Sequence, residues 1–229
     1  MKLGKVTESR RNEAKRSYGD ACGTAHGLEL IGERWALLVL RELMLGPRRF
    51  SELRADLPGI SANVLTQRLT ELEERGLVIR RRLPRPANVQ VYEATEWGLE
   101  AEPIVQTLGR WAARSPRHDP TLPISGVSIL LSMRTMFDRQ KIEGMTATIQ
   151  FRFGSDSYVA RIGNGEIDIA PGETEEADLT VEADPPANLA AVMYGKASYD
   201  LITWSGDRKL LDRFVDLFHL PPKASIPGH

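Results

Sequence analysis

The sequence predicts a two-domain α+β protein, and three observations support this expectation. The chain has 229 residues, of which 41% are apolar and 27% charged, enough for two folded domains with their own cores. Three prolines between Ser115 and Pro123 forbid a regular helix there. Through His118 there are 20 Lys and Arg against 15 Asp and Glu, and after it 10 against 16. The predicted segments are a basic arm (1–17), a first domain (18–115), a linker (116–123), a second domain (124–222) and a tail (223–229).

Several classes of protein are excluded by what the sequence lacks. The longest apolar runs, such as 36–40 and 129–131, are too short to cross a bilayer, and residues 1–17 contain no apolar signal segment. We therefore expect a cytoplasmic protein without membrane partners. No nucleophile–base pair, phosphate-binding glycine loop or ligand-spaced histidine cluster is present, so we expect no enzyme activity, no cofactor and no metal.

The first half alternates helical and strand-like patterns. Apolar residues recur at helical spacing, and Gly–Pro or Pro–Gly steps end the segments. Two β-branched, Arg-rich stretches flank a loop with two prolines, which predicts a hairpin with an exposed tip. The expected elements are helices at 25–31, 34–45, 50–57 and 61–75, strands at 77–83 and 89–94 around the tip Pro84–Asn88, and a fifth helix at 96–113.

This order predicts a winged helix-turn-helix whose fourth helix reads DNA. Leu65, Leu69 and Leu72 share one helix face and must pack inward. The opposite face then carries amide and hydroxyl groups, and Asn or Gln can make paired hydrogen bonds to adenine. Arginines near the helix starts and the hairpin can neutralise phosphates. The candidate DNA-binding residues are Arg48, Arg49, Ser61, Asn63, Thr66, Gln67, Arg68, Arg81, Arg82 and Arg85.

Two plainer interpretations stay open for these residues. A polar helix face is commonly just solvated, which would leave Asn63, Thr66 and Gln67 without a DNA partner. Residues 80–82 alternate between the two faces of a strand, so one or two of these arginines can pair with the carboxylates of Glu73, Glu74 or Glu93 instead.

The first half resembles the HxlR family of winged-helix regulators over residues 18–114. This resemblance implies double-stranded operator DNA with two-fold symmetry as the partner, and a homodimer held by the N-terminal region and the fifth helix. Ile104, Val105, Leu108 and Trp111 are therefore expected between two subunits. The matching segments are Leu30–Trp35, Leu40–Leu43, Gly46–Leu53, Leu57–Ser61, Val64–Leu69, Leu72–Glu73, Gly76–Arg80, Tyr92, Thr95–Glu96, Gly98 and Trp111.

Cys22 is the single cysteine of the chain. It stands where many proteins of the resembled family carry a cysteine, which makes it a candidate redox sensor. It is followed by Gly23 rather than the proline usual in that family, and no second cysteine is available within the chain. Any disulfide would join two subunits, and the alternative is a small buried apolar residue.

The second half predicts an α+β domain with an antiparallel sheet. Residues 127–137 are spaced as an amphipathic helix, and Thr146–Phe153 alternates polar and apolar side chains as a half-buried strand does. Further strands are expected at 157–162, 166–170, 178–183 and 201–205, with helices at 186–194 and after Gly206–Asp207.

That order resembles the sterol-carrier-protein (SCP2-like) domain. The resemblance rests on the strand pairs, Ala177–Val181, the Leu189–Gly195 helix and Trp204–Asp207 before a terminal helix. It implies an apolar tunnel for a hydrophobic small molecule, although the same residues could simply fill a core, and a degenerate domain could serve only dimerisation. The candidate effector-binding residues are Met133, Met136, Phe137, Phe151, Phe153, Met193, Tyr194, Trp204, Phe214 and Phe218.

Together these expectations describe a dimeric, sequence-specific transcriptional regulator. Its second domain would sense a hydrophobic effector or stabilise the dimer. The alternative is a lipid-carrier or interaction protein whose winged helix no longer binds DNA.

Overall fold

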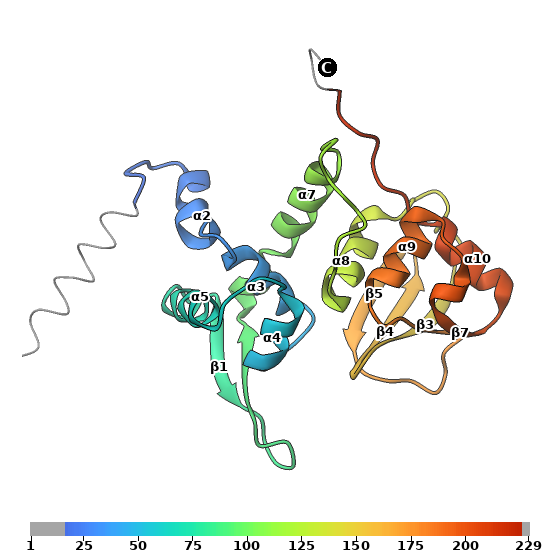
Figure 1. The fold of residues 1–229 in the computed structure, drawn as a ribbon, viewed down its shortest axis with the longest axis horizontal. Coiled ribbons are helices and arrows are strands. Elements are labelled where there is room, and N and C mark those ends of the chain that lie inside the picture. The colour runs from blue at the N-terminus through green and yellow to red at the C-terminus, as the bar shows by residue number, and fades with distance from the viewer. Residues whose placement is uncertain (1–16, 226–229) are drawn as a thin grey trace, which may run out of the picture.

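The computed structural model describes residues 17–225, so residues 1–16 of the predicted arm and 226–229 of the tail lie outside the described part. Two bodies lie side by side, a mainly helical N-terminal one and a sheet-containing C-terminal one (Figure 1). No helix within 17–225 has the length and apolar character needed to span a membrane. The N-terminal elements are α2 (Gly23–Ile31), α3 (Ala36–Glu42), α4 (Phe50–Asp56), α5 (Ala62–Glu74), β1 (Val78–Arg82), β2 (Gln90–Ala94), α6 (Glu96–Leu99) and α7 (Glu102–Ala113).

Helix α5 forms where the leucine spacing predicts it. The Ser61 hydroxyl accepts the N–H of Val64 at 3.3 Å and so caps the first turn. Leu65, Leu69 and Leu72 are buried, which fixes the inward face of the helix. The helix ends before Gly76, whose φ of 75° is costly for other residues.

The predicted hairpin is confirmed. β1 and β2 pair antiparallel, with Val78 opposite Ala94 and Arg82 opposite Gln90. The tip Pro84–Asn88 is exposed and extends away from the helices as a wing (Figure 1).

The single helix expected at 96–113 is wrong, because the chain divides it into α6 and α7. Pro103 lies in the first turn of α7. Proline has no N–H, and its ring would clash with the carbonyl of Leu99 in a continuous helix. The second predicted helix likewise begins at Ala36 rather than Arg34, since Trp35 has a left-handed φ of 77°.

The second domain contains a five-stranded sheet flanked by helices. Its strand order is β5–β4–β3–β6–β7. Phe151 of β3 contacts Phe214 of α10, with ring centroids 5.8 Å apart, so α10 packs on the sheet face that carries Phe151. The elements are α8 (Gly126–Met136), β3 (Ala147–Phe153), β4 (Asp156–Gly163), β5 (Glu166–Pro171), β6 (Leu179–Glu182), α9 (Ala187–Gly195), the 3-10 turn η1 (Tyr199–Leu201), β7 (Thr203–Gly206) and α10 (Arg208–Asp216).

The expectation of a wholly antiparallel sheet is wrong, because β6 pairs parallel with β3. After β5 the chain crosses the sheet and inserts β6 on the far side of β3. The fully buried Gln150 side chain holds this crossover. Its amide nitrogen donates to the carbonyl of Gly172 at 3.2 Å, and its oxygen accepts the N–H of Thr174 at 2.9 Å.

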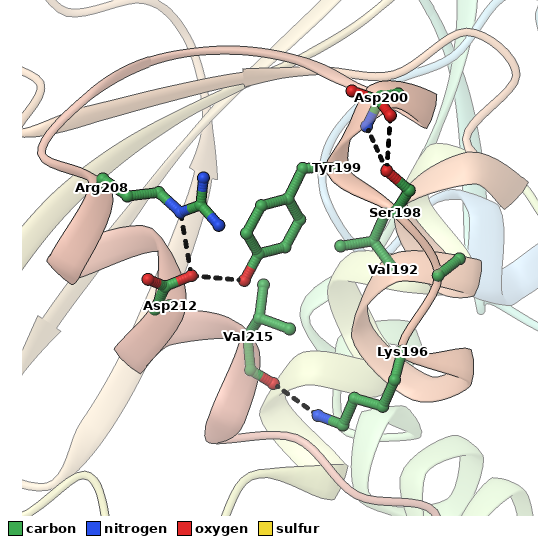
Figure 2. Close-up of a pocket in the computed structure, with 9 residues that line it drawn as sticks. Val192, Lys196, Ser198, Tyr199, Asp200, Arg208, Asp212 and Val215 are labelled. Carbon is green, nitrogen blue, oxygen red and sulfur yellow. Dashed lines mark hydrogen bonds and ion pairs between the residues drawn. The ribbon is translucent and has the colours of Figure 1, made fainter.

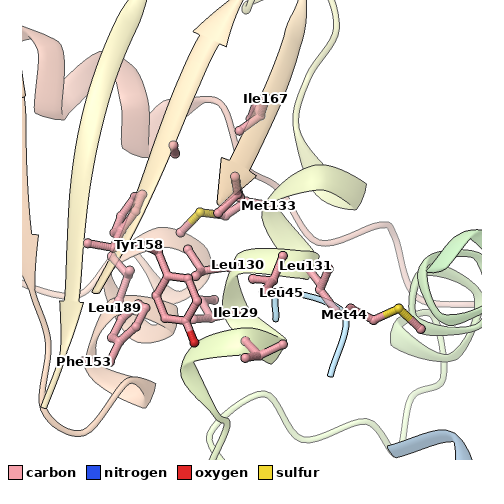
Figure 3. Packing of buried hydrophobic residues seen from close by; sticks show 14 of the residues in the cluster. Met44, Leu45, Ile129, Leu130, Leu131, Met133, Phe153, Tyr158, Ile167 and Leu189 are labelled. Carbon is pink, nitrogen blue, oxygen red and sulfur yellow. The ribbon is translucent and has the colours of Figure 1, made fainter. Parts of the chain in front are cut away.

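The two domains share one continuous apolar core. Met44 and Leu45 of the first domain lie beside Leu131 of α8 (Figure 3). Gly46 bends the chain here with a φ of 124°, and a Cβ at this position would lie 3.2 Å from Pro171 of β5. The second domain therefore packs directly against the first.

The C-terminal segment returns to the first domain. The Lys223 ammonium donates to the carbonyls of Ala113 and Ser115, each at 3.1 Å, just past the end of α7. The N–H of Ala224 donates to the carbonyl of Arg114 at 2.7 Å. The lysine thereby satisfies carbonyls that the helix end leaves free.

Candidate nucleic-acid interface

The outward face of α5 carries short polar side chains. Asn63, Thr66 and Gln67 are exposed, as the leucine spacing predicts. The Thr66 hydroxyl donates to the carbonyl of Ala62 at 2.9 Å, and the Gln67 amide nitrogen donates to Glu71 at 3.1 Å. Amides on an exposed helix face match the hydrogen-bonding groups at base edges in a major groove.

Of the three arginines predicted on the wing, two are more accessible than the third. Arg81 forms an ion pair with Glu93 on the neighbouring strand, one of the pairings left open above. Arg82 donates from Nε to the Asn88 side chain at 2.8 Å and stays exposed, as does Arg85 at the tip. Arg82 and Arg85 are therefore the two predicted wing arginines that remain accessible to a phosphate.

Arg68 points into the protein. Its residue is only 6% exposed, and Nη1 lies 2.8 Å from Glu71 and 3.1 Å from Glu33. The carboxylates offset the cost of burying the guanidinium. In this conformation Arg68 braces α5 from inside instead of facing a phosphate.

Arg48 and Arg49 point in different directions. Arg49 is exposed, with Nε 3.5 Å from Glu52, and remains accessible to a phosphate. Arg48 is buried between an ion pair with Asp56 and a 2.6 Å contact to Asp156 of the second domain. Arg48 thus joins the two domains.

A second polar contact crosses the domain boundary near Arg48. Glu42 is fully buried and accepts hydrogen bonds from Arg41 at 2.8 Å and from the Ser125 hydroxyl at 2.9 Å. Burial raises the pKa of Glu42, and Arg41 counteracts this shift. The contact with Ser125 was not predictable from the sequence, because Glu42 and Ser125 lie far apart along the chain.

Cys22 is exposed immediately before α2. The backbone N–H groups of Thr24 and Ala25, at the start of α2, lower the pKa of its thiol. The buried alternative is therefore wrong for this conformation. The redox role stays a prediction, and it requires Cys22 of a second subunit if the product is a disulfide.

The helix α7 exposes an apolar face. Trp111 is 71% exposed, while Ile104 and Leu108 are about half exposed and Val105 is partly buried. Further large apolar side chains are exposed on α2 and α6, among them Leu28 and Trp97. This is the surface on which the sequence predicts a second subunit.

The ten predicted effector residues lie in the second domain, and most of them are buried in its core. Met133, Met193 and Phe218 are fully buried, and Phe214 contacts Phe218 at 5.0 Å between ring centroids. Phe137, Tyr194 and Trp204 are partly exposed and pack against the outside of this core. The remaining members, buried with at most 7% exposure, are Met136, Phe151 and Phe153.

A surface pocket between α9 and α10 was not predictable from the sequence. None of the ten predicted effector residues lines it. Its charged side chains, Lys196, Asp200, Arg208 and Asp212, have no motif spacing in the sequence. They come together only because η1 and β7 bring α10 back against α9.

The first domain has the architecture of a winged helix-turn-helix protein, a class that places one helix in the major groove and a hairpin beside it. The family model described as HxlR-like helix-turn-helix matches residues 30–119. The chain belongs to this family.

Relatives and solved structures match the same half. The HTH-type transcriptional regulator YkvN of Bacillus subtilis (strain 168) is 42% identical over 91 residues, which cover 40% of this chain and 77% of YkvN. YodB of the same organism is 39% identical over 83 residues, covering 36% of this chain and 74% of YodB. The structure of reduced YodB from B. subtilis matches with a TM-score of 0.39 and 33% identity, over 44% of this chain and 100% of YodB. These relatives are transcriptional regulators by name.

Proposed function

We propose that this protein is a dimeric, sequence-specific DNA-binding transcriptional regulator. The observation that carries the proposal is the exposed face of α5, where Asn63, Thr66 and Gln67 stand together on a helix held rigidly by three buried leucines. Asn63 and Gln67 supply paired hydrogen bonds to base edges, and Thr66 offers a methyl and a hydroxyl. Ser61 lies at the end of α5 that would enter the groove.

Phosphate contacts are assigned to the exposed arginines around this helix. Arg49, Arg82 and Arg85 are accessible, and Arg81 would have to share its charge with Glu93. Arg48 and Arg68 are already paired with carboxylates. They therefore stabilise the helix-turn-helix around α5 unless DNA binding breaks these ion pairs. Two subunits related by a two-fold axis would read two half-sites about one DNA turn apart, ~34–36 Å.

The test of this function is a titration of operator and random DNA with defined variants. We expect Gln67→Ala to reduce the discrimination between the two by about 1–3 kcal/mol, because a paired base contact is lost. Arg85→Ala should weaken both kinds of binding alike and lower the salt slope by about one unit per subunit, since it contacts phosphate only. Fluorescence anisotropy at several salt concentrations measures both quantities.

Gln140→Ala, an exposed glutamine of the second domain, is the matched control and should change nothing. A wild-type protein that distinguishes no sequence in a genomic selection contradicts the proposal. That outcome favours the alternative of a lipid-carrier or interaction protein whose winged helix no longer binds DNA.

We further propose that the second domain, which resembles SCP2-like domains, adjusts DNA affinity through an apolar effector held among Met133, Phe151, Met193 and Phe214. These side chains now fill the core, so a ligand must displace them or open α8 and α10. Helix α8 contacts α3, and α3 contacts the DNA-reading helix α5, so a movement of α8 can be passed on to α5.

A fluorescent fatty acid titrated with and without operator tests this coupling. We expect saturable binding whose affinity differs about 5- to 150-fold between the two titrations. Equal affinity would remove the regulatory role, and absence of binding would leave the second domain a structural support.

A further inference from the structure

A pocket of about 420 Å³ lies between the end of α9 and α10, on the outside of the second domain. Val192 and Val215 supply apolar walls, and Tyr199 stands between Arg208 and Lys196 (Figure 2). Pockets of this size accommodate small organic molecules. Its chemistry differs from that of the core, because charged groups line it.

The carboxylates of the pocket are already occupied by protein donors. Asp212 accepts the Tyr199 hydroxyl at 2.8 Å and Arg208 Nε at 3.1 Å, and these bonds lower the pKa of Asp212. Asp200 accepts the Ser198 hydroxyl at 2.7 Å. Asp212 therefore already has a cationic partner, and Asp200 already has a hydroxyl donor.

The cationic groups keep donors to spare. Arg208 lies over the rings of Tyr199 and Trp204, with its guanidinium carbon 4.6 and 5.7 Å from the ring centroids. Within residues 17–225 its hydrogen bond to Asp212 uses Nε, which leaves the Nη groups as donors. Lys196 donates to the carbonyl of Val215 at 3.3 Å, which engages one of its three N–H groups. The pocket therefore has free N–H donors on two positively charged side chains, which favours a negatively charged hydrogen-bond acceptor as its ligand.

The walls limit the size of an occupant. Val192 and Val215 are buried, and behind them Met193 and Phe214 are fully buried in the core. A long acyl chain would have to displace these side chains, whereas a compact molecule can stay in the pocket without entering the core.

We propose that this pocket binds a compact organic acid, whose carboxylate accepts hydrogen bonds from the free Nη groups of Arg208, while Lys196 contributes a second positive charge and the apolar body lies beside Val192 and Val215. The site is separate from the core residues assigned above to an apolar effector. Its existence does not depend on DNA binding, so each proposal can fail alone.

Methyl-selective NMR of the full chain tests the site with three probes of one shape. Benzoate is the anion, benzamide its neutral counterpart and benzylammonium the cation. We expect benzoate to shift the methyl signals of Val192 and Val215 saturably, with a Kd on the order of 1 mM for a ligand this small. Benzamide and benzylammonium should bind at least about tenfold more weakly, because a charge-assisted hydrogen bond is lost.

Two variants assign the donors, and a third is their control. Arg208→Gln and Lys196→Asn should each raise the benzoate Kd about tenfold. Asn suits position 196, whose φ is 54°. Arg213→Gln removes the same charge from the same helix but lies outside the pocket, and should leave the Kd unchanged.

Three outcomes overturn the proposal. They are equal binding of the three probes, benzoate shifts confined to methyl groups elsewhere, and a Kd unaffected by both pocket variants. Thermal unfolding of each variant shows whether it remains folded. If one of the two pocket variants does not, the Kd of the other one tests the proposal.

Discussion

Replacing Arg48 by methionine should lower the free energy of unfolding by about 2–4 kcal/mol. Methionine keeps the apolar stem of the side chain, so the loss comes from the guanidinium. Its removal leaves Asp56 and Asp156 facing each other across the domain boundary without a cation. Both carboxylates keep partial access to water, which places the effect at the lower part of the range for broken buried ion pairs. Urea unfolding followed by circular dichroism measures the change.

Arg49→Met is the matched control, since the neighbouring side chain is 52% exposed and should cost less than about 1 kcal/mol. A cycle with Asp156→Asn isolates the contact between domains. If Arg48→Met and Asp156→Asn prove strictly additive, Arg48 does not join the two domains energetically.

The Trp111→Ala variant should dissociate the proposed dimer, raising its dissociation constant about 30-fold or more. A large aromatic side chain that is 71% exposed on one subunit is the kind of residue that dominates an interface. Leu108 lies one turn and Ile104 two turns before Trp111 on the same helix face. Sedimentation equilibrium over a range of concentrations gives the constant for both proteins.

Leu201→Ala, an exposed apolar residue of the second domain, controls for a general loss of surface apolarity. A wild-type protein that stays at 25.5 kDa at micromolar concentration would refute the dimer itself. An unchanged constant for Trp111→Ala would move the interface away from α7.

Local patterns predicted most of the secondary structure. The leucines of α5, the Ser61 cap and the proline-rich tip of the wing act over a few residues, so their signals are visible in the sequence. Pro103 is an equally local signal, because its ring clashes with the carbonyl of residue 99 in a continuous helix, so the division of the fifth helix was also predictable.

Long-range pairing was not predictable in the same way. Alternation identifies a strand but does not reveal its neighbours, so β6 could not be placed parallel to β3 before Gln150 and the crossover were seen. The same reason explains Arg48 and Arg68. An arginine near a helix start suggests a phosphate, while its real partners, Asp156 and Glu33, are distant in sequence.

The return of the C-terminal segment to α7 restricts how the second domain can move. Its entry through residues 114–125 and its exit through Pro222 and Lys223 both meet the first domain near the end of one helix. A body attached at two neighbouring points can swing about the line between them but cannot twist freely or drift away. A swing of the second domain about this line would have to break the contact of Arg48 with Asp156, which belongs to neither attachment point.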